Sequence, residues 1–305
     1  MMRFVVRRAI WLVLTLWIVF TISFFLMRNT KGGPFDGERT VDPVIKKQLE
    51  ARYHLDKPIW DQYWLTIGNY LRGDFGYSIK MPDQRVSYFV REGLPISAVL
   101  GLLSLTLAIV IGVTIGVLAA LRRGGIVDTS LMALATIGIA VPNFILASLA
   151  VLLFAFIWHW FPPAGWGEPE HLILPVCCLA APYAAYIARL TRTSMLEVLG
   201  QDYLRTAMAK GLSPSRIVIR HALRGALLPV VTYLGPAAAG ILTGSLVIEQ
   251  TFGIPGLGTH FVKAAITYDY TLCMGLVLLY TLILYTLNFL VDLSYSWLDP
   301  RVKLE

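Results

Sequence analysis

The chain alternates long apolar runs with short polar segments, a pattern typical of a helical membrane protein. A helix needs about 20 apolar residues to cross the hydrocarbon core of a bilayer. Pro142, Pro175 and Pro182 interrupt two of the runs, but neighbouring helices can satisfy the backbone carbonyls that such prolines free. We therefore predict an all-α integral membrane protein with six transmembrane helices. The six runs are residues 9–27, 96–121, 131–158, 172–187, 228–248 and 272–295.

The first run has two interpretations. Arg3, Arg7 and Arg8 precede it, as in a secretory signal peptide. However, the run is long, and no small-residue cleavage pattern follows it before the polar segment that begins at Arg28. We therefore interpret it as an uncleaved membrane anchor.

Composition and charge agree with a membrane protein. Of the 305 residues, 56% are hydrophobic and 15% are charged, whereas soluble domains carry about 25% charged residues. The formal net charge of +7 could indicate nucleic acid binding. The basic residues cluster instead in short loops between the apolar runs, as they do in the cytoplasmic loops of membrane proteins. No nucleic acid partner is therefore expected.

The basic residues also predict the orientation of the chain. With the N-terminus inside, the inner segments hold fourteen Lys and Arg residues, and the short outer loops hold only Lys263. Cytoplasmic loops carry such an excess, so both termini are predicted to be cytoplasmic. The inner residues are Arg3, Arg7, Arg8, Arg122, Arg123, Arg189, Arg192, Arg205, Lys210, Arg216, Arg220, Arg224, Arg301 and Lys303.

Residues 28–95 look like the one soluble part of the chain and separate the first helix (1–27) from a five-helix core (96–305). Asp42 and Pro43 have the positions of an N-cap and a first helical residue, which predicts a helix over 41–53. Apolar residues at helical spacing predict another over 60–71. We expect a small extracytoplasmic helical insertion, partly buried through its aromatic residues; the alternative is a solvated loop.

No catalytic or metal-binding motif is found. The sequence lacks metalloprotease and serine hydrolase patterns, and its five histidines are scattered. Residues 32–40 resemble a phosphate-binding loop, but Glu38 replaces the required lysine and no strand precedes it. Cys177, Cys178 and Cys273 lie in apolar runs and are read as small buried hydrophobic residues. We therefore predict that the chain is not an enzyme and binds no metal or cofactor.

The large inner loop, residues 189–228, carries the clearest local pattern. It predicts a short helix that begins near Met195 and ends at Gly211, where glycine would adopt the left-handed conformation of a C-terminal cap. Ser213 and Pro214 would then begin a second helix, as cap and first-turn residue. The result is a pair of short helices at a rigid elbow. They could bind anionic lipid or dock into a cytoplasmic partner, and the local pattern does not separate these two roles.

Two further features concern the packing and the outer end of the chain. Gly112 and Gly116 form a pair that permits close helix approach, and a second pair is Gly240 and Gly244. Residues 253–258 are too rich in glycine for a regular helix and predict a re-entrant turn near an outer gate. Glu249 ends an apolar run and is a functional candidate by default. Its alternative is an interfacial carboxylate that pairs with Lys263 or caps a turn.

The inner loop resembles that of the membrane subunits of binding-protein-dependent ABC importers. Their shared motif has Glu-Ala-Ala where this chain has Arg205, Thr206 and Ala207, and the motif glycine falls at Gly211. The motif's later Ile-x-Leu-Pro is replaced at 221–224, with the proline delayed to Pro229. Residues 205–212 and 220–229 are similar to the version of this loop in peptide permeases. Segments 34–40, 53–55, 73–76, 247–249 and 255–258 also look like the B-type permease of oligopeptide importers.

The resemblance implies the type I ABC importer permease fold in a bacterial inner membrane. It implies a peptide substrate, a homologous C-type permease that completes the pathway, two cytoplasmic ATPases that use ATP and Mg²⁺, and an extracytoplasmic peptide-binding protein. The inner loop would couple to the ATPases, and the glycine-rich turn would belong to the outer gate. The coupling residues would be Asp202, Tyr203, Arg205, Thr206, Ala207, Lys210 and Gly211, and the gate candidates Glu249, Pro255, Gly256 and Gly258.

Several alternatives remain at this point. Related importers carry dipeptides, glutathione or nickel, and the sequence separates them only weakly. A membrane-embedded enzyme would need acidic, His or Ser groups that converge at one membrane depth, and none is evident. A channel or carrier that works without ATPases would show internal inverted repeats, and no convincing repeat is found.

Overall fold

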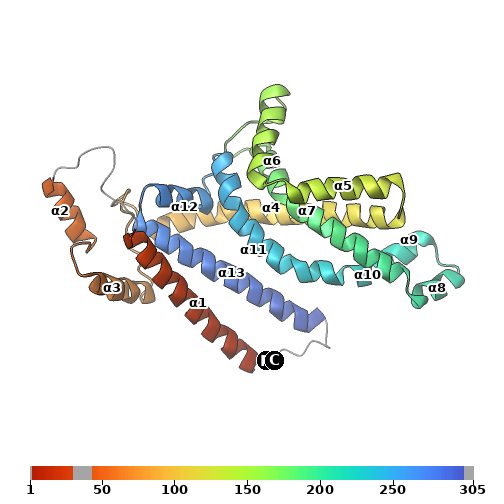
Figure 1. The fold of residues 1–305 in the computed structure, drawn as a ribbon, viewed down its shortest axis with the longest axis horizontal. Helices are drawn as coiled ribbons and strands as arrows, with labels where there is room; N and C mark the ends of the chain where they lie inside the picture. Colours follow the sequence, from red (N-terminus) through yellow and green to blue (C-terminus); the bar gives the residue numbers. More distant parts are fainter. Residues whose placement is uncertain (1, 30–42, 299–305) are drawn as a thin grey trace. The chain divides into compact units, whose positions relative to one another are not determined.

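The computed structural model describes residues 2–29 and 43–298, and helices dominate both ranges (Figure 1). Apart from an isolated bridge between Tyr77 and Arg85, no strand pairing occurs within them. The chain forms two compact units. One contains the residues up to Ile96 together with Pro255–Thr286, and the other contains mainly Ser97–Ile254.

Within the described residues, five helices are long and apolar enough to cross a membrane, and a bent helix pair brings the number to six if it counts as one span. This confirms the all-helical prediction and the approximate positions of the runs. The helices extend beyond the predicted apolar runs because polar residues continue their backbone hydrogen bonding past the ends. They are α1 (Met2–Asn29), α4 (Val86–Leu121), α7 (Glu170–Leu199), α11 (Leu228–Thr251) and α13 (Tyr270–Leu298).

The third predicted run is interrupted at Pro142, as predicted, and the break is a sharp bend. It divides into α5 (Ile126–Ala140) and an arm made of α6 (Asn143–Ala150) and the π-helical turn η1 (Val151–Ile157). The two parts are bent by 106°. The residue before a proline avoids the helical conformation, and Val141 accordingly has extended backbone before Pro142.

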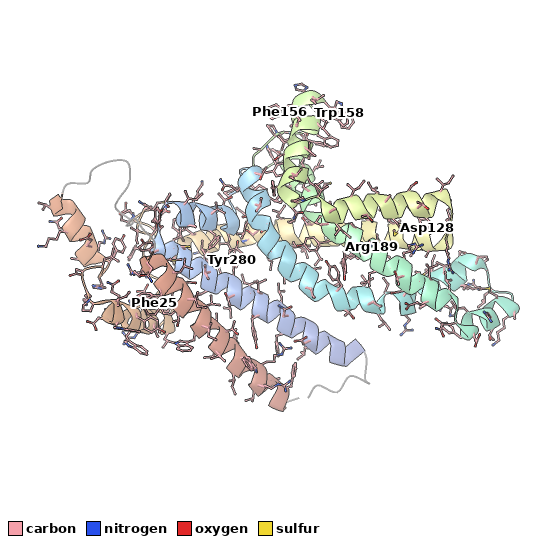
Figure 2. The ribbon with its side chains drawn as sticks, viewed as in Figure 1. Phe25, Asp128, Phe156, Trp158, Arg189 and Tyr280 are labelled. Atoms are coloured by element: carbon pink, nitrogen blue, oxygen red, sulfur yellow. The ribbon has the colours of Figure 1, made fainter. Side chains whose placement is uncertain are left out.

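The arm of α6 and η1 ends in exposed aromatic side chains. Phe156 and Trp158 lie near its tip, with 61% and 47% of their surfaces exposed (Figure 2). The Trp158 and Trp160 rings pack at 4.8 Å between centroids. Aromatic residues of this kind are typical of membrane–water interfaces.

The first glycine pair packs α4 against α7 within the same chain. A β-carbon on Gly112 would lie 2.7 Å from the carbonyl oxygen of Ala184, and one on Gly116 would lie 2.5 Å from the β-carbon of Thr191. Such distances leave no room for a side chain. The close helix approach predicted from the spacing is therefore confirmed, and its partner is α7 rather than another subunit.

Gly116→Ala is expected to lower the free energy of unfolding by about 1–3 kcal/mol, because the added methyl group overpacks the α4–α7 contact. Thermal unfolding of the detergent-purified protein measures this change. Gly68→Ala is the matched control, since a β-carbon at Gly68 meets no atom within 4 Å and alanine favours a helix. A Gly116→Ala protein as stable as the parent would contradict the packing argument.

The insertion after α1 contains the two predicted helices, α2 (Pro43–Arg52) and α3 (Ile59–Leu71). The predicted N-cap Asp42 and the loop at 32–40 lie outside the described residues. The aromatic residues of α3 are partly buried, as predicted: Tyr63 is 3% exposed and packs against Phe20 and Phe24 of α1. The hydroxyl groups of Thr21 and Tyr63 lie 2.8 Å apart and share a hydrogen bond.

A buried carboxylate fixes the loop after α3 to the start of α13. Asp269 is 1% exposed and accepts a hydrogen bond from the Ser78 hydroxyl. Its oxygens also accept the backbone N–H groups of Ile79 at 3.1 Å, Lys80 at 3.3 Å and Leu272 at 3.1 Å. These donors compensate for the loss of hydration of the carboxylate and join segments that are distant in sequence.

Candidate functional site

The inner loop forms a series of short helices. They are α8 (Asp202–Ala209), α9 (Pro214–Arg216), the π-helical turn η2 (Ile217–Ala222) and α10 (Leu223–Ala226). The predicted start near Met195 was wrong, because α7 continues through that residue to Leu199. The break comes at Gly200 and Gln201, and the extended backbone of Gln201 turns the chain into α8.

One face of α8 is seated on apolar side chains. Leu204 is fully buried and Ala207 is 9% exposed, as expected for residues three apart on one helix face. They belong to a buried cluster with Ala120 at the end of α4 and Met195 in α7. We call this cluster the α8 seat; its remaining members are Ile217, Ala222 and Ala226. The seat fixes a short polar helix that would not be stable alone.

The rest of α8 is exposed, including Tyr203 and Met208 at the two edges of its buried face. Tyr203 is 51% exposed and Met208 is 52% exposed. Asp202 and Arg205 form an ion pair at 3.6 Å, but their side chains are 95% and 74% exposed, so the pair contributes little stability. A seated helix that presents a tyrosine and a methionine to its surroundings has the composition of a protein docking surface.

The elbow after α8 has the predicted left-handed glycine. Gly211 has a φ of +76°. Its N–H donates to the Met208 carbonyl at 2.9 Å, and the Leu212 N–H donates to the Ala207 carbonyl at 3.3 Å. These two bonds form a Schellman motif. A β-carbon on Gly211 would meet no atom within 4 Å, so the requirement for glycine comes from backbone conformation rather than from space.

The chain resumes a helix at Ser213 and Pro214, as predicted. Ser213 occupies the N-cap position and Pro214 the first turn. The expected side-chain cap is absent, because the Ser213 hydroxyl makes no capping hydrogen bond. Proline alone sets the start of this helix, since its fixed φ suits the first turn.

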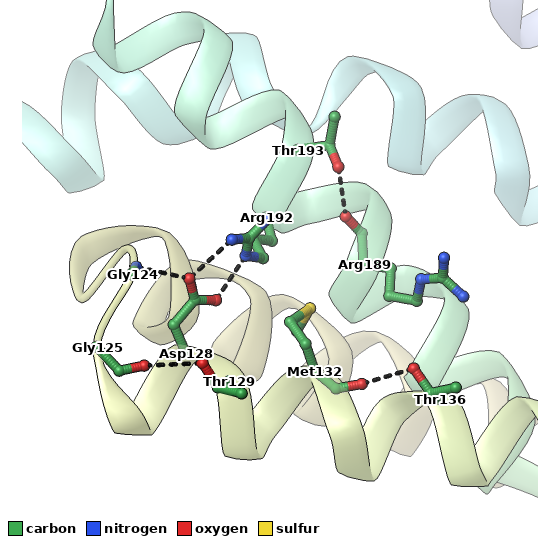
Figure 3. Close-up of polar contacts among 9 residues, drawn as sticks. All are labelled: Gly124, Gly125, Asp128, Thr129, Met132, Thr136, Arg189, Arg192 and Thr193. Carbon is green, nitrogen blue, oxygen red and sulfur yellow. Dashed lines mark hydrogen bonds and ion pairs between the residues drawn. The ribbon is translucent and has the colours of Figure 1, made fainter.

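A buried ion pair braces α7 just before it leads into α8. The Arg192 Nε and Nη2 atoms donate to the two oxygens of Asp128 at 2.6 and 2.7 Å (Figure 3). The Gly124 N–H also donates to Asp128, at 2.9 Å. Asp128 is 3% exposed. This bidentate pair therefore ties α5 and the loop before it to α7.

The Asp128–Arg192 pair is expected to act as one unit. Asp128→Ala and Arg192→Ala should each lower the unfolding temperature, and the double variant should lose no more than the worse single variant. Thermal unfolding of the purified protein tests this cycle. The exposed pair of Asp202 and Arg205 is the matched control, since its removal should leave the unfolding temperature unchanged. Strictly additive losses at Asp128 and Arg192 would argue against the brace.

A shallow polar groove runs beside this brace, along α5 and α7. Arg189 is exposed in it, and its side chain extends away from Asp128 (Figure 3). The hydroxyl-bearing residues Thr136 and Thr193 also line the groove. Ionisable residues in membrane helices face protein or water rather than lipid. This face of α5 and α7 therefore offers a cationic, hydroxyl-bearing surface beside the brace.

Glu249 lies at the outer candidate site and is fully buried. The Ser97 hydroxyl donates to its Oε1 atom at 2.7 Å. The backbone around it closes a second Schellman motif, in which the Ile254 N–H donates to the Glu249 carbonyl at 2.9 Å and Gly253 has a φ of +63°. This carboxylate is therefore part of the packed interior, and its gate role stays a prediction.

The glycine-rich turn is shorter than predicted. A regular helix, α12 (Leu257–Ile266), begins directly after Gly256, so Gly258 lies in its first turn. The prediction that residues 253–258 form no regular helix was thus wrong at this end. Pro255 and Gly256 precede the helix, and Gly93 packs against it: a β-carbon on Gly93 would lie 2.9 Å from the Leu257 nitrogen.

Sequence reasoning missed three residues of these sites. Asp128 is an acidic residue near the start of an apolar run, which could have drawn attention as an intramembrane carboxylate. Ser97 and Gly93 carry no such signal, because their roles arise from contacts more than 150 residues away along the chain. These contacts depend on the tertiary fold.

The structure places the cysteines and the other potential metal ligands apart. Cys178 and Cys273 are buried, as predicted, whereas Cys177 is exposed, and all three are free thiols. Within 2–29 and 43–298, no three His, Cys, Asp or Glu side chains gather at a spacing that could hold a metal ion.

Comparison with known proteins gives a consistent result over the whole chain. The family described as "Binding-protein-dependent transport system inner membrane component" matches residues 112–304. The dipeptide transport system permease protein DppB of Bacillus subtilis is 47% identical over 304 residues, covering 100% of this chain and 99% of that protein. The oligopeptide transport system permease proteins OppB of Haemophilus influenzae and Escherichia coli are each 45% identical, covering 99% of this chain and 100% of the relative.

Among solved structures, the chain is similar to one from the inward-facing MetNI methionine ABC transporter. The TM-score is 0.60, with 21% sequence identity, over 70% of this chain and 97% of that chain. At this level of identity the likeness concerns the fold, which is that of an ABC importer permease.

Proposed function

The chain belongs to the family of binding-protein-dependent transport system inner membrane components. We propose that it is the permease subunit of an ATP-driven peptide importer and that it forms half of the translocation pathway. Members of this family are non-catalytic, multi-pass subunits of inner-membrane transporters that work with ATPases and binding proteins. The observation that carries the peptide assignment is similarity over the full length to dipeptide and oligopeptide permeases.

The proposed complex has a homologous C-type permease as the other half of the pathway. Two cytoplasmic ATPases, which use ATP and Mg²⁺, dock on the inner loops, and an extracytoplasmic peptide-binding protein delivers the substrate. Both termini are then cytoplasmic, in keeping with the excess of Lys and Arg in the inner segments. Gly256 and its neighbours belong to the opposite, outer end of the pathway.

The geometry of α8 supports the docking role. Its buried face fixes it to α4 and α7, and Tyr203 and Met208 are exposed along the edges of that face. An ATPase that moves against these two side chains would push on a seated helix rather than on a loose loop. The Asp128–Arg192 brace lies two turns before the end of α7 and would carry that push into α5.

Co-purification tests the docking role directly. Tyr203→Ala together with Met208→Ser should reduce the ATPase retained with the purified permease, because truncation of exposed anchor residues weakens an interface. Tyr88→Ala is the matched control: Tyr88 is 49% exposed, close to the 51% of Tyr203, but lies near the start of α4. Full retention of ATPase by the double variant would overturn the docking proposal.

The substrate class is tested separately by uptake into cells that carry the complete transporter. Competition by dipeptides, longer peptides, glutathione and Ni²⁺ should show peptides to be the effective competitors. Competition by Ni²⁺ or glutathione alone would overturn the peptide assignment while leaving the ATPase docking intact.

A further inference from the structure

A partly enclosed cavity of about 200 Å³ lies where α1, α3 and the start of α13 meet. Its cationic wall is formed by Arg28 of α1 and Arg52 at the end of α2, with His54 beside them. Among the described residues, Asp74 is the one carboxylate in the lining, and its Oδ1 atom already accepts the Gly76 N–H at 3.0 Å. The cavity therefore carries an excess of positive charge, which suits an anionic ligand.

The guanidinium of Arg28 is held in place by aromatic rings. Its central carbon lies 5.3 Å from the ring centroid of Phe24 and 5.3 Å from that of Tyr270. Both rings lie within cation–π distance of the guanidinium, and Arg28 lines the cavity, where its N–H groups can donate to an oxyanion. Burial raises the pKa of the Tyr70 hydroxyl, so this lining residue is a neutral hydrogen-bond donor at physiological pH.

An apolar groove of about 460 Å³ shares two walls with this cavity, Tyr70 and Phe75. It lies along α1 and α13, two helices that Figure 1 shows side by side. Every other lining residue is apolar, including Val13 and Phe20 of α1 and Leu282 of α13. A polar ligand would gain nothing in such a groove, whereas a hydrocarbon chain would bury its surface there.

The cavity and the groove together extend over the depth of one leaflet. From Arg28 at the cavity to Val13 at the far end of the groove, α1 rises about 22 Å at 1.5 Å per residue. Half of the hydrocarbon core is about 15 Å thick. The groove itself follows α1 for about 10 Å, from Phe20 to Val13, so it would hold the lower part of an acyl chain whose headgroup lies in the cavity.

We propose that the cavity and the groove together bind one anionic phospholipid, with its phosphate on Arg28 and Arg52 and an acyl chain along α1 and α13. The lipid lies in the leaflet on the side of α2 and α3. A peptide carboxylate could occupy the cavity alone, but it would leave the adjoining groove empty. The cationic cavity continues into the apolar groove, and this arrangement favours a phospholipid over a peptide carboxylate.

Native mass spectrometry of the intact transporter, with added phosphatidylglycerol or phosphatidylcholine, tests this site. The parent should retain one phosphatidylglycerol in preference to phosphatidylcholine. Arg52→Gln should weaken retention about ten-fold, since it removes a charged hydrogen-bond donor from an exposed position where folding is unaffected. Arg28→Gln should act in the same direction, and Arg72→Gln, an exposed arginine outside the cavity lining, should retain the lipid as the parent does.

The groove has its own test. Leu282→Trp fills it and should also release phosphatidylglycerol, whereas Leu290→Trp, on the same helix but outside the groove, should not. Equal retention of both lipids by the parent would overturn the proposal. So would loss of binding in Arg52→Gln together with full retention in Leu282→Trp, or displacement of the lipid by a peptide or by inorganic phosphate. Those results would assign the cavity to a free anion.

Discussion

Replacing Gly211 by valine is expected to lower ATP-driven peptide uptake about ten-fold while the chain still folds and enters the membrane. Gly211 has a φ of +76°, a conformation that costs an L-residue about 1–2 kcal/mol and a β-branched residue more. Valine would therefore open the Schellman motif that sets the direction of the chain after α8. No atom lies within 4 Å of the added β-carbon, so the packed core is spared.

Gly211→Asn is the matched variant, because asparagine tolerates the left-handed conformation better than other non-glycine residues. Uptake of labelled peptide and ATP hydrolysis are measured together in proteoliposomes that contain the complete transporter. The asparagine variant should keep much of the parent's uptake, and the valine variant should hydrolyse ATP without matching transport. Parent-level uptake by the valine variant, or an equal loss of uptake in both variants, would show that the left-handed conformation at Gly211 is not needed to couple ATP hydrolysis to transport.

Leu204→Asp is expected to reduce uptake further, by roughly 100-fold, because an unpaired carboxylate in the α8 seat costs more than about 3 kcal/mol. Leu204 is fully buried among apolar side chains that include Ala120, Met195 and Ile217. No donor in this cluster could satisfy the new charge, so α8 should leave its seat. An ATPase would then push on a helix that no longer transmits the motion to α7.

Met208→Asp separates seating from docking. Met208 lies one turn after Leu204, but it is 52% exposed and does not belong to the α8 seat, so its substitution should leave the seat intact. Limited proteolysis should cut the inner loop of Leu204→Asp much faster than that of the parent, whereas Met208→Asp should resemble the parent. Met208→Asp is expected to lose ATPase binding instead. Slow cleavage of Leu204→Asp would show that α8 stays in place despite the new charge, and would contradict the claim that the burial of Leu204 holds this helix.

Much of this fold could be predicted from the sequence, because the largest energies act locally along each helix. Apolar runs of membrane-spanning length predict the helices whatever their packing. Glycine at position 211 predicts the left-handed elbow because glycine, which has no β-carbon, adopts a positive φ without steric cost. Proline at position 142 predicts a break in the third run, but the bend of 106° depends on how α6 packs against α7 and α11.

The parts that could not be predicted are contacts between distant segments. Asp128 and Arg192 lie 64 residues apart, and the sequence gives no hint that one carboxylate and one guanidinium meet. Ser97 and Glu249 are a similar case. At Gly258 the local sequence was misleading: the glycine content of residues 253–258 predicted no regular helix, but Gly258 lies in α12. The buried leucine at position 257 and the packing of this turn on Gly93 outweigh the weak helix propensity of glycine there.

Uptake of a labelled peptide into proteoliposomes shows whether this chain forms half of a peptide pathway that external ATPases drive. The chain is reconstituted alone, or together with the partner permease, the ATPases and the binding protein. We expect uptake only when all components and ATP are present. Uptake by the chain alone, at the rate of the complete transporter and without ATP, would show that it is a self-contained carrier.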